Sequence, residues 1–572
     1  MLHPHLHWIQ SESWTVQKSS TYRAMGWRTC SFIISLNLII LWTISSASVK
    51  PSPIVPVTGG LIQGGMEEIQ KVKVFFYLGI PFAEPPVGPL RFTYPKDPKP
   101  WKGVRNTTQH APKCLQELVN DDDDDDESPP LRISEDCLYL DVYTPELNTD
   151  LHNYNPLPVI VCIHGDRLIT GSSSDFQGYL MVSLHRVVVV SIQYRLGIAG
   201  FLSTGDKWAE GNFGMVDQLA ALLWVQKNIE RFAGDMESVT LFGQFSGAIS
   251  SSLFALLPMT SSLFHRVIIE GGSALIPGII TPNKTQLAHE ASQIGNCNTR
   301  NSMEILSCLR NKTEDEMRTI IINVNKKYQV IPVVMDGKVI VDDPRRILAD
   351  RHFRRIWYLI GLDTYGVVDH IIHTYVLPEW LQGISKETAM GFINKHLTPL
   401  FGVKSAEKIF KEYFTNVTHP LSILDNLIEM TTDALVIIPL IQTAQFLRDG
   451  ECTVYFYEIE HTSHFNTLFS DLTVYTRLPF VFGGNIKPDI KTTLGSMAGE
   501  RRLYNLMMKH WINFALDGDP NSPDLSYWPS FDAKEQYKLF NLTISVRQRF
   551  RQYRMDFWSK VIPRNVTIIL IL

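Results

Sequence analysis

The sequence lacks the features that would assign a chemical function directly. It has no His, Cys, Asp or Glu spacing typical of a metal site, no phosphate-binding loop and no dinucleotide-binding fingerprint, and the GIAG segment at 197–200 is too short to count as one. Basic residues do not outnumber acidic ones, since 53 Lys and Arg stand against 58 Asp and Glu for a net charge of −5. We therefore expect no metal ion, no cofactor and no nucleic-acid partner.

Long apolar runs are also scarce. The apolar stretch Phe32–Ile44 follows Arg28 and precedes the small residues Ser45–Ala47. This order predicts a secretory signal peptide within residues 1–47, with an upstream extension before Met25. The run is too short for a stable membrane span, so we expect a secreted protein, with a retained anchor as the alternative.

The cysteines and the glycosylation signals agree with secretion. Two close pairs could each close a short loop in an oxidising compartment, namely Cys114 with Cys137 and Cys297 with Cys308. Cys162 and Cys452 lie in apolar, strand-like runs, and we expect them to be buried free thiols. The chain also carries N-x-T glycosylation signals, at Asn106, Asn283, Asn311, Asn416, Asn541 and Asn565.

Stretches typical of strands and helices alternate in the first half of the chain. Apolar runs that end at turns predict strands, several of them buried on both faces, at 74–83, 157–165, 187–197 and 238–244. Residues 217–229 have apolar side chains at helical spacing, and a helix of small residues begins at Gly247. The alternation predicts an α/β protein with a largely parallel sheet and helices on both faces.

The acidic run Asp121–Asp126 is the one low-complexity segment. Like charges in a row repel one another, so we expect a solvated loop between Cys114 and Cys137. Carboxylates also bind calcium, but the spacing and the glycine of an EF-hand are missing, so calcium is the less favoured alternative.

Long motifs are spread over the chain from Gly59 to Trp558. They are FFYLGIPFAEPPVGPLRF (75–92), SEDCLYLDVYTP (134–145), QYRLGIAGFLSTGD (193–206), GNFGMVDQLAALLWVQKNIERFAGD (211–235), MMKHWINFALDGDPN (507–521) and YWPSF (527–531). Together they resemble the type-B carboxylesterase family, which includes liver carboxylesterases, cholinesterases and the non-enzymatic neuroligins. The resemblance implies one α/β-hydrolase domain, residues 48–560, with a helical cap region.

Members of that family carry G-x-S-x-G on a sharp strand-to-helix turn, which lifts the serine hydroxyl above the sheet. Here the segment reads GQFSG from Gly243 to Gly247, so Phe245 occupies the nucleophile position. Ser246 lies one residue late, where the family uses the backbone N–H as an oxyanion donor. Because a one-residue shift at a tight turn redirects the side chain, we expect Phe245 to fill the former cavity and Ser246 not to replace the nucleophile.

The family's H-G-G-G sequence supplies oxyanion-hole N–H groups from residues without a Cβ. This chain reads His164-Gly165-Asp166-Arg167, so Gly165 and Asp166 join Ser246 at the predicted oxyanion-hole positions. The Asp166 carboxylate would oppose a developing oxyanion unless Arg167 compensated it. Loss of one such donor typically lowers the rate about 100- to 1,000-fold. We interpret Asp166 and Arg167 as a surface turn without a role, in preference to a new binding site.

The family's general base is a histidine just before a P-F-V-F-G-like strand, which Leu478–Gly483 matches. That match places Val474, which cannot accept a proton, at the base position. His461 and His464 lie upstream and could swing in, although ordinary loop histidines are the preferred interpretation.

The family's acid falls in Ile360–Gly366, at Thr364 or Asp363. A carboxylate at that place would orient nothing without a serine and a histidine beside it.

These replacements predict a carboxylesterase-like protein without intact catalytic residues. Three hypotheses remain open: a binding or interaction protein for a small apolar or ester ligand, a carboxylic ester hydrolase acting through Ser246 or another relocated serine, and a decaying paralogue without function. The C-terminal tail, residues 561–572, lacks the H-x-E-L-type retention signal of luminal family members and is too short to span a bilayer.

Overall fold

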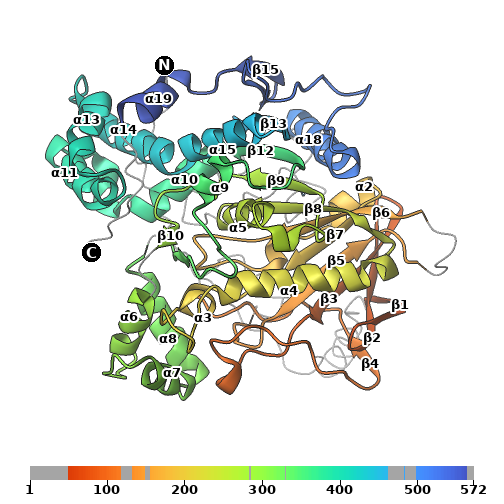
Figure 1. The fold of residues 1–572 in the computed structure, drawn as a ribbon. Helices are drawn as coiled ribbons and strands as arrows, with labels where there is room; N and C mark the ends of the chain where they lie inside the picture. The colour runs from red at the N-terminus through yellow and green to blue at the C-terminus, as the bar shows by residue number, and fades with distance from the viewer. Residues whose placement is uncertain are drawn as a thin grey trace, which may run out of the picture. The chain divides into compact units, whose positions relative to one another are not determined.

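The computed structural model describes residues 49–117, 132–148, 155–281, 285–328, 330–461, 482 and 498–562. The chain divides into two units, Met1–Val49 and Lys50–Leu572, and the second unit holds the sheet and helices of Figure 1. The predicted signal peptide and the run Asp121–Asp126 lie outside the described residues, as do 563–572 of the predicted tail.

The described residues form a 13-stranded sheet in the order β1-β2-β3-β5-β7-β6-β8-β9-β12-β13-β14-β15, with β4 paired to β2. Strands from β7 to β14 in this order pair in parallel, and the pairs at both ends of the order are antiparallel. The prediction of a largely parallel sheet in an α/β fold is therefore confirmed. The strands are β1(Lys50–Val57), β2(Gly60–Ile69), β3(Val72–Pro81), β4(Val104–Asn106), β5(Tyr139–Thr144), β6(Leu157–Ile163), β7(Val188–Ile192), β8(Gly234–Gln244), β9(Arg266–Glu270), β12(Trp357–Asp363), β13(Thr453–Ile459), β14(Gln536–Phe540) and β15(Ser545–Gln548), with β10(Ile280–Thr281) and β11(Val333–Val334) as a separate pair.

The central strands are buried on both faces because helices cover both sides of the sheet. Successive side chains of a strand point to opposite faces. In β6, Val159 and Val161 belong to one apolar core while Ile160 and Cys162 belong to the other. This arrangement explains why the sequence of β6 is a continuous apolar run rather than an alternating one.

One face is covered partly by helices that are near in the chain, and the other combines an early helix with a late one (Figure 1). α4 and α5 contribute to the first core, and α2 and α18 to the second. Within the described residues, no helix combines the length and the apolar character needed to cross a membrane. The α-helices are α2(Tyr179–Leu184), α3(Gly197–Phe201), α4(Phe213–Asn228), α5(Ser246–Ala255), α6(Gln286–Ile294), α7(Ser302–Arg310), α8(Glu314–Asn325), α9(Pro344–Ala349), α10(Thr364–Tyr375), α11(Lys386–Phe392), α12(Thr398–Phe401), α13(Val403–Phe414), α14(Pro420–Thr432), α15(Ile438–Asp449), α18(Ala498–Asp517) and α19(Gln552–Asp556).

Several local predictions can be compared with the fold directly. The apolar run 187–197 was expected to be one strand, but β7 ends at Ile192 and α3 begins at Gly197. Gly197 has a φ of +53°, a conformation that other residues rarely adopt, so the chain can turn there from strand to helix. Both predicted disulfides are present, and Cys162 and Cys452 are buried free thiols, as expected.

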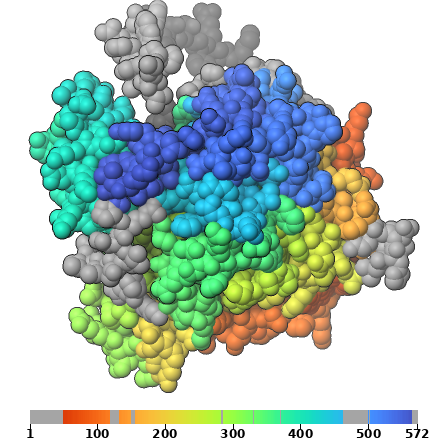
Figure 2. Space-filling view, turned by 45° about the horizontal axis from the view of Figure 1, so that its top comes forward, coloured from red at the N-terminus to blue at the C-terminus, as the bar shows by residue number. Residues whose placement is uncertain are grey.

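The C-terminal helix α19 is tied to the helical region between β12 and β13. Figure 2 shows this dark blue segment lying against the cyan helices of that region. Arg554 contacts Glu412 of α13 and Glu429 of α14, and Arg551 lies 3.3 Å from the fully buried carboxylate of Asp433. Burial raises the pKa of Asp433 to about 6, against the lowering effect of Arg551.

Candidate functional site

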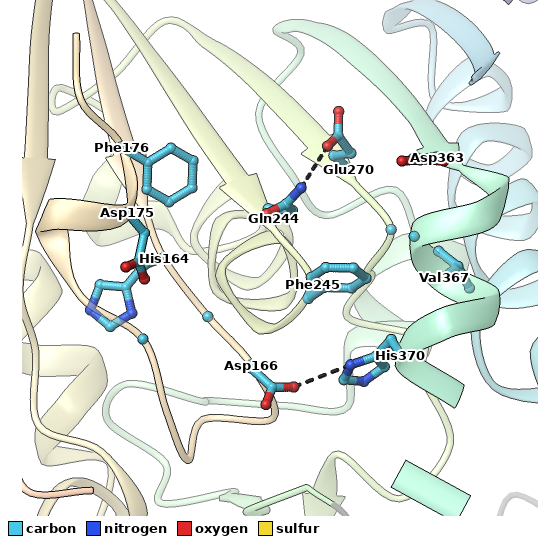
Figure 3. A pocket seen from close by; sticks show the side chains of 14 residues that line it. His164, Asp166, Asp175, Phe176, Gln244, Phe245, Glu270, Asp363, Val367 and His370 are labelled. Atoms are coloured by element: carbon cyan, nitrogen blue, oxygen red, sulfur yellow. Dashed lines mark hydrogen bonds and ion pairs between the residues drawn. The ribbon is translucent and has the colours of Figure 1, made fainter. Parts of the chain in front are cut away.

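The carboxyl ends of four neighbouring parallel strands meet at a pocket, which is the usual location of ligand sites in α/β sheets. β6 leads into a loop at its wall, β8 into the turn before α5, β9 ends at Glu270, and β12 leads into α10. The cavity volume is about 50 Å³. Figure 3 shows the side chains that line it, among them His164, Asp166, Phe245, Glu270, Asp363 and His370.

The turn between β8 and α5 has the strained backbone that a nucleophile turn requires. Phe245 has φ 48° and ψ −113°, which is unfavourable for a residue with a Cβ. Close packing of the glycines enforces this geometry: a Cβ on Gly243 would lie 2.2 Å from the carbonyl oxygen of Gly247, and a Cβ on Gly247 would lie 1.9 Å from that of Ile163. The backbone of the turn is therefore set by packing, whatever side chain position 245 carries.

The side chain of Phe245 is a wall of the pocket. It is half-buried and stacks on the imidazole of His370, with ring centroids 4.9 Å apart and ring planes 21° from parallel. Figure 3 shows it between His370 on one side and Gln244 with Glu270 on the other. An aromatic ring thus occupies the place from which a serine hydroxyl would act.

Ser246 points away from this pocket. Its side chain is 2% exposed, and its hydroxyl oxygen accepts a hydrogen bond from the backbone N–H of Leu168 at 3.0 Å. It is not among the pocket's lining residues. A Cβ on Gly165 would lie 2.2 Å from this hydroxyl oxygen, so the glycine leaves room for it. The hydroxyl serves to hold the loop after β6.

That loop, residues 164–171, differs from the predicted surface turn. Asp166 is 6% exposed, so the prediction of a surface Asp–Arg turn is wrong. The Asp166 carboxylate is buried because three partners surround it: Arg167 Nε at 3.2 Å, Thr170 Oγ1 at 3.1 Å and His370 Nδ1 at 3.2 Å. Its backbone N–H, at a predicted oxyanion-hole position, donates to the Thr170 carbonyl at 3.2 Å. This donor therefore already has a partner.

His370, on α10, is a pocket residue that sequence reasoning missed. No local pattern distinguishes it from other helical histidines; the one available signal was its place shortly after the family's acid position. Its ring presents a face to Phe245, while its nitrogens lie in the ring plane and Nδ1 is directed to Asp166. A base must aim an in-plane nitrogen lone pair at the proton it takes. His370 is not oriented in that way toward position 245.

The two acid candidates have different surroundings. Asp363 lines the pocket, is 8% exposed, and caps α10 by accepting the backbone N–H of Tyr365 at 3.0 Å. Thr364 donates its hydroxyl to Glu458 at 3.1 Å and does not line the pocket. Of the base candidates, Val474 and His464 lie outside the described residues, and His461 is buried but does not line the pocket.

Two further buried groups complete the pocket, and sequence reasoning singled out neither as a pocket residue. Glu270 accepts hydrogen bonds from Gln244 Nε2 at 2.9 Å and Tyr457 Oη at 2.8 Å, and burial raises its pKa. His164 is 1% exposed and stacks on Tyr194, and burial lowers its pKa to about 3. It is therefore neutral at physiological pH.

Comparison with known proteins identifies the relatives of this chain. A model of the Carboxylesterase family matches residues 51–558. An acylcarnitine hydrolase of Rattus norvegicus is 36% identical over 558 residues, covering 93% of this chain and 95% of its own. The cocaine esterase of Homo sapiens is 35% identical over 561 residues (93% and 96%), and carboxylesterase 5A of Canis lupus familiaris is 36% identical over 542 residues (91% and 92%). These matches confirm the family resemblance seen in the sequence motifs.

Proposed function

This chain belongs to the carboxylesterase family, and we propose that within it the chain is a non-hydrolytic member that binds a small ligand in the pocket at Phe245. The observation that carries the proposal is the turn itself. Its strained backbone is intact, yet it presents a phenyl ring where covalent catalysis needs a nucleophile. Substitution of the nucleophile removes the step on which the rest of such a mechanism depends.

The surrounding groups support the same proposal. The backbone N–H of Asp166 is bonded within its own loop, and the Asp166 carboxylate adds negative charge where an oxyanion would form. Arg167 and His370 offset this charge by binding the same carboxylate, so they are not aimed at a substrate oxygen. Each feature by itself disfavours acyl transfer.

Hydrolysis through Ser246 is the alternative, and the geometry disfavours it. The Ser246 hydroxyl is buried against Leu168, and the pocket does not reach it. An active Ser246 would require the loop after β6 to move and a base to approach from another element.

The experiment that tests the proposal is labelling of the purified full-length chain with a fluorophosphonate probe, together with turnover of p-nitrophenyl acetate and butyrate. The human cocaine esterase serves as the positive control. We expect no labelling and no turnover above a heat-denatured sample. Stoichiometric labelling that maps to Ser246, and that is lost in Ser246→Ala, would overturn the proposal in favour of the relocated serine.

We further propose that the chain is secreted and glycosylated. Asn106, Asn311 and Asn416 are exposed and Asn541 is half-buried, which suits glycan attachment, whereas Asn283 and Asn565 lie outside the described residues. Expression in mammalian cells should place the protein in the medium, with a mobility that shifts on glycosidase treatment. Retention of all product inside the cells would contradict secretion, and failure to accumulate any product would favour the decaying paralogue.

A further inference from the structure

The segment after β4 connects the sheet with the pocket. Residues 107–117 begin beside β3, where the Thr107 carbonyl accepts the Leu78 N–H at 2.7 Å. They end at the loop after β6, where the Gln116 side chain donates to the Gly171 carbonyl at 3.0 Å and accepts the Gly171 N–H at 3.1 Å. Gly171 lines the pocket. The position of this segment therefore affects how firmly the pocket wall is held.

An ion pair fixes the middle of this segment to the sheet. His110 Nδ1 lies 2.9 Å from Asp141 Oδ2 on β5, and the other oxygen of this carboxylate accepts the Gly79 N–H of β3 at 2.8 Å. The side chain of Asp141 is 1% exposed, and that of His110 is 18% exposed. The carboxylate is thus shielded from water, whereas the imidazole can exchange its proton with solvent.

The partner of Asp141 differs from the partners of other buried carboxylates. Glu135 is paired with Arg91 at 2.5 Å, and Asp217 with Arg195 at 2.7 Å. An arginine keeps its charge at physiological pH, whereas a histidine loses its charge near neutrality. Within the part of the chain that the structure describes, no lysine or arginine side chain bonds to Asp141. Its buried charge is therefore compensated in mildly acidic solution and uncompensated in alkaline solution.

The charges around His110 favour its protonated form. Burial lowers the pKa of His110, but the charge and hydrogen bond of Asp141 and the charge of Asp175 together raise it above the ordinary value. Because this pKa exceeds the value of about 6.5 in the unfolded chain, the resulting stability is fully present below pH 6.5. It is lost as the pH rises through the pKa of the folded protein.

Two further titratable groups belong to the same neighbourhood. The phenol of Tyr143 on β5 is neutral, because burial and the charge of Asp141 raise its pKa. The ammonium group of Lys113, on the same segment as His110, acts with burial to lower the pKa of His164. The charges that raise the pKa of His110 come from carboxylates of two different elements.

We propose that His110 and Asp141 form a pH-dependent latch, which holds residues 107–117 on the sheet in mildly acidic solution and releases them as the solution becomes alkaline. Through Gln116, the latch also affects how firmly the loop after β6 is held at the pocket. Its role in ligand binding rests on the proposed function, whereas the latch itself can be tested without a ligand.

The test is hydrogen–deuterium exchange of the full chain at pH 5.5 and pH 8.5. Exchange is expressed as protection factors, which are corrected for the intrinsic dependence of exchange on pH. The informative amides are those of Leu78, which bonds to Thr107, and Gly79, which bonds to Asp141. The amide of Gly171 reports on the pocket loop.

The comparison variant is His110→Gln, which keeps a donor for the Asp141 carboxylate but cannot become charged. At pH 5.5 these amides should be about tenfold more protected in the parent than in the variant, because hydrogen bonds between charged groups are the stronger ones. At pH 8.5 the two chains should agree. His164 is present in both, so its own response to pH cancels in this comparison.

Two further variants complete the experiment. Asp141→Asn removes the charge from the other side of the latch but still accepts the Gly79 N–H, so protection should lose its excess at pH 5.5. His265→Gln is the matched control, because His265 also pairs with a carboxylate, Glu237 at 3.5 Å, but lies outside residues 107–117. It should leave these amides as protected as in the parent at both pH values.

Equal protection of the parent and His110→Gln at pH 5.5 would overturn the inference. A deficit of the same size at both pH values would also overturn it, since the histidine would then act through its shape and not through its charge. Neither result bears on the proposed function, which fails through labelling of a serine in the fluorophosphonate experiment.

Discussion

The turn at Phe245 and the loop of residues 164–171 converge on one pocket but are held in different ways. Glycines that admit no Cβ hold the turn, since Gly247 lies against the Ile163 carbonyl and Gly272 against that of Phe245. Side-chain bonds hold the loop, because Asp166 binds Arg167, Thr170 and His370. The turn therefore has a strained backbone that carries a phenyl ring, whereas the loop is held by the contacts of its own side chains. The strained backbone of the turn therefore indicates the fold of the family, whereas the side chains at the turn determine which reaction it can perform.

The largest effect on folding stability is expected at Gly247, where the turn is packed most tightly. Gly247→Ala places a methyl group 1.9 Å from a backbone carbonyl that cannot move aside, so we expect a loss of about 3 kcal/mol in unfolding free energy or failure to fold. Urea unfolding followed by circular dichroism measures it. Gly391→Ala is the control: it lies in α11 with no atom within 4 Å of the added Cβ and should gain up to about 1 kcal/mol. Similar stability of the two variants would show that the turn is not set by packing.

The loop should instead respond to pH through His164. Because its pKa is about 3 in the folded protein and about 6.5 in the unfolded chain, the unfolded chain takes up a proton as the pH falls below 6.5 while the folded protein does not. Folding stability is therefore fully present above pH 6.5 and is lost toward acid. His164→Phe keeps an aromatic ring against Tyr194 but cannot titrate.

Relative to its value at pH 8, the stability difference between His164→Phe and the parent should move in favour of the variant by about 2 kcal/mol at pH 5. Urea midpoints at the two pH values measure this change. His352→Gln, at an exposed histidine, is the control and should follow the parent. A pH-independent difference for His164→Phe would mean that the folded protein also protonates His164.

The smallest effect on folding stability is expected for substitution of Phe245, the residue at the family's nucleophile position. Phe245→Ser should lower stability by only about 1 kcal/mol, because the ring is half-buried, and it should not restore ester turnover. His370 offers a ring face to this position, and the Asp166 N–H remains bonded to Thr170. Hydrolysis of p-nitrophenyl butyrate measures activity. Appreciable turnover by this single variant would show that a working base is already in place.

The fold could be predicted from local patterns, whereas the pocket could not. Continuous apolar runs such as 157–165 reflect burial on both faces of a sheet. Because this burial requires nearly every residue of the strand to be apolar, the strand can be recognised in the sequence. Short Cys spacing likewise sufficed for both disulfides. Family motifs located the turn at Phe245 and the acid candidate Asp363. The burial of Asp166 was missed because it depends on His370, whose helix follows a different strand, and no local signal connects the two residues.

The ion pairs between α19 and the helical region determine when this region can finish folding during synthesis. Asp433 is fully buried, and the arginines that compensate its charge, Arg551 and Arg554, come near the end of the chain. Until these arginines have been synthesised, a packed helical region would enclose an uncompensated carboxylate. We therefore expect this region to complete its packing only after the C-terminal segment has been translated. In a chain truncated before Arg551, the helical region should be the part that proteases cleave most readily.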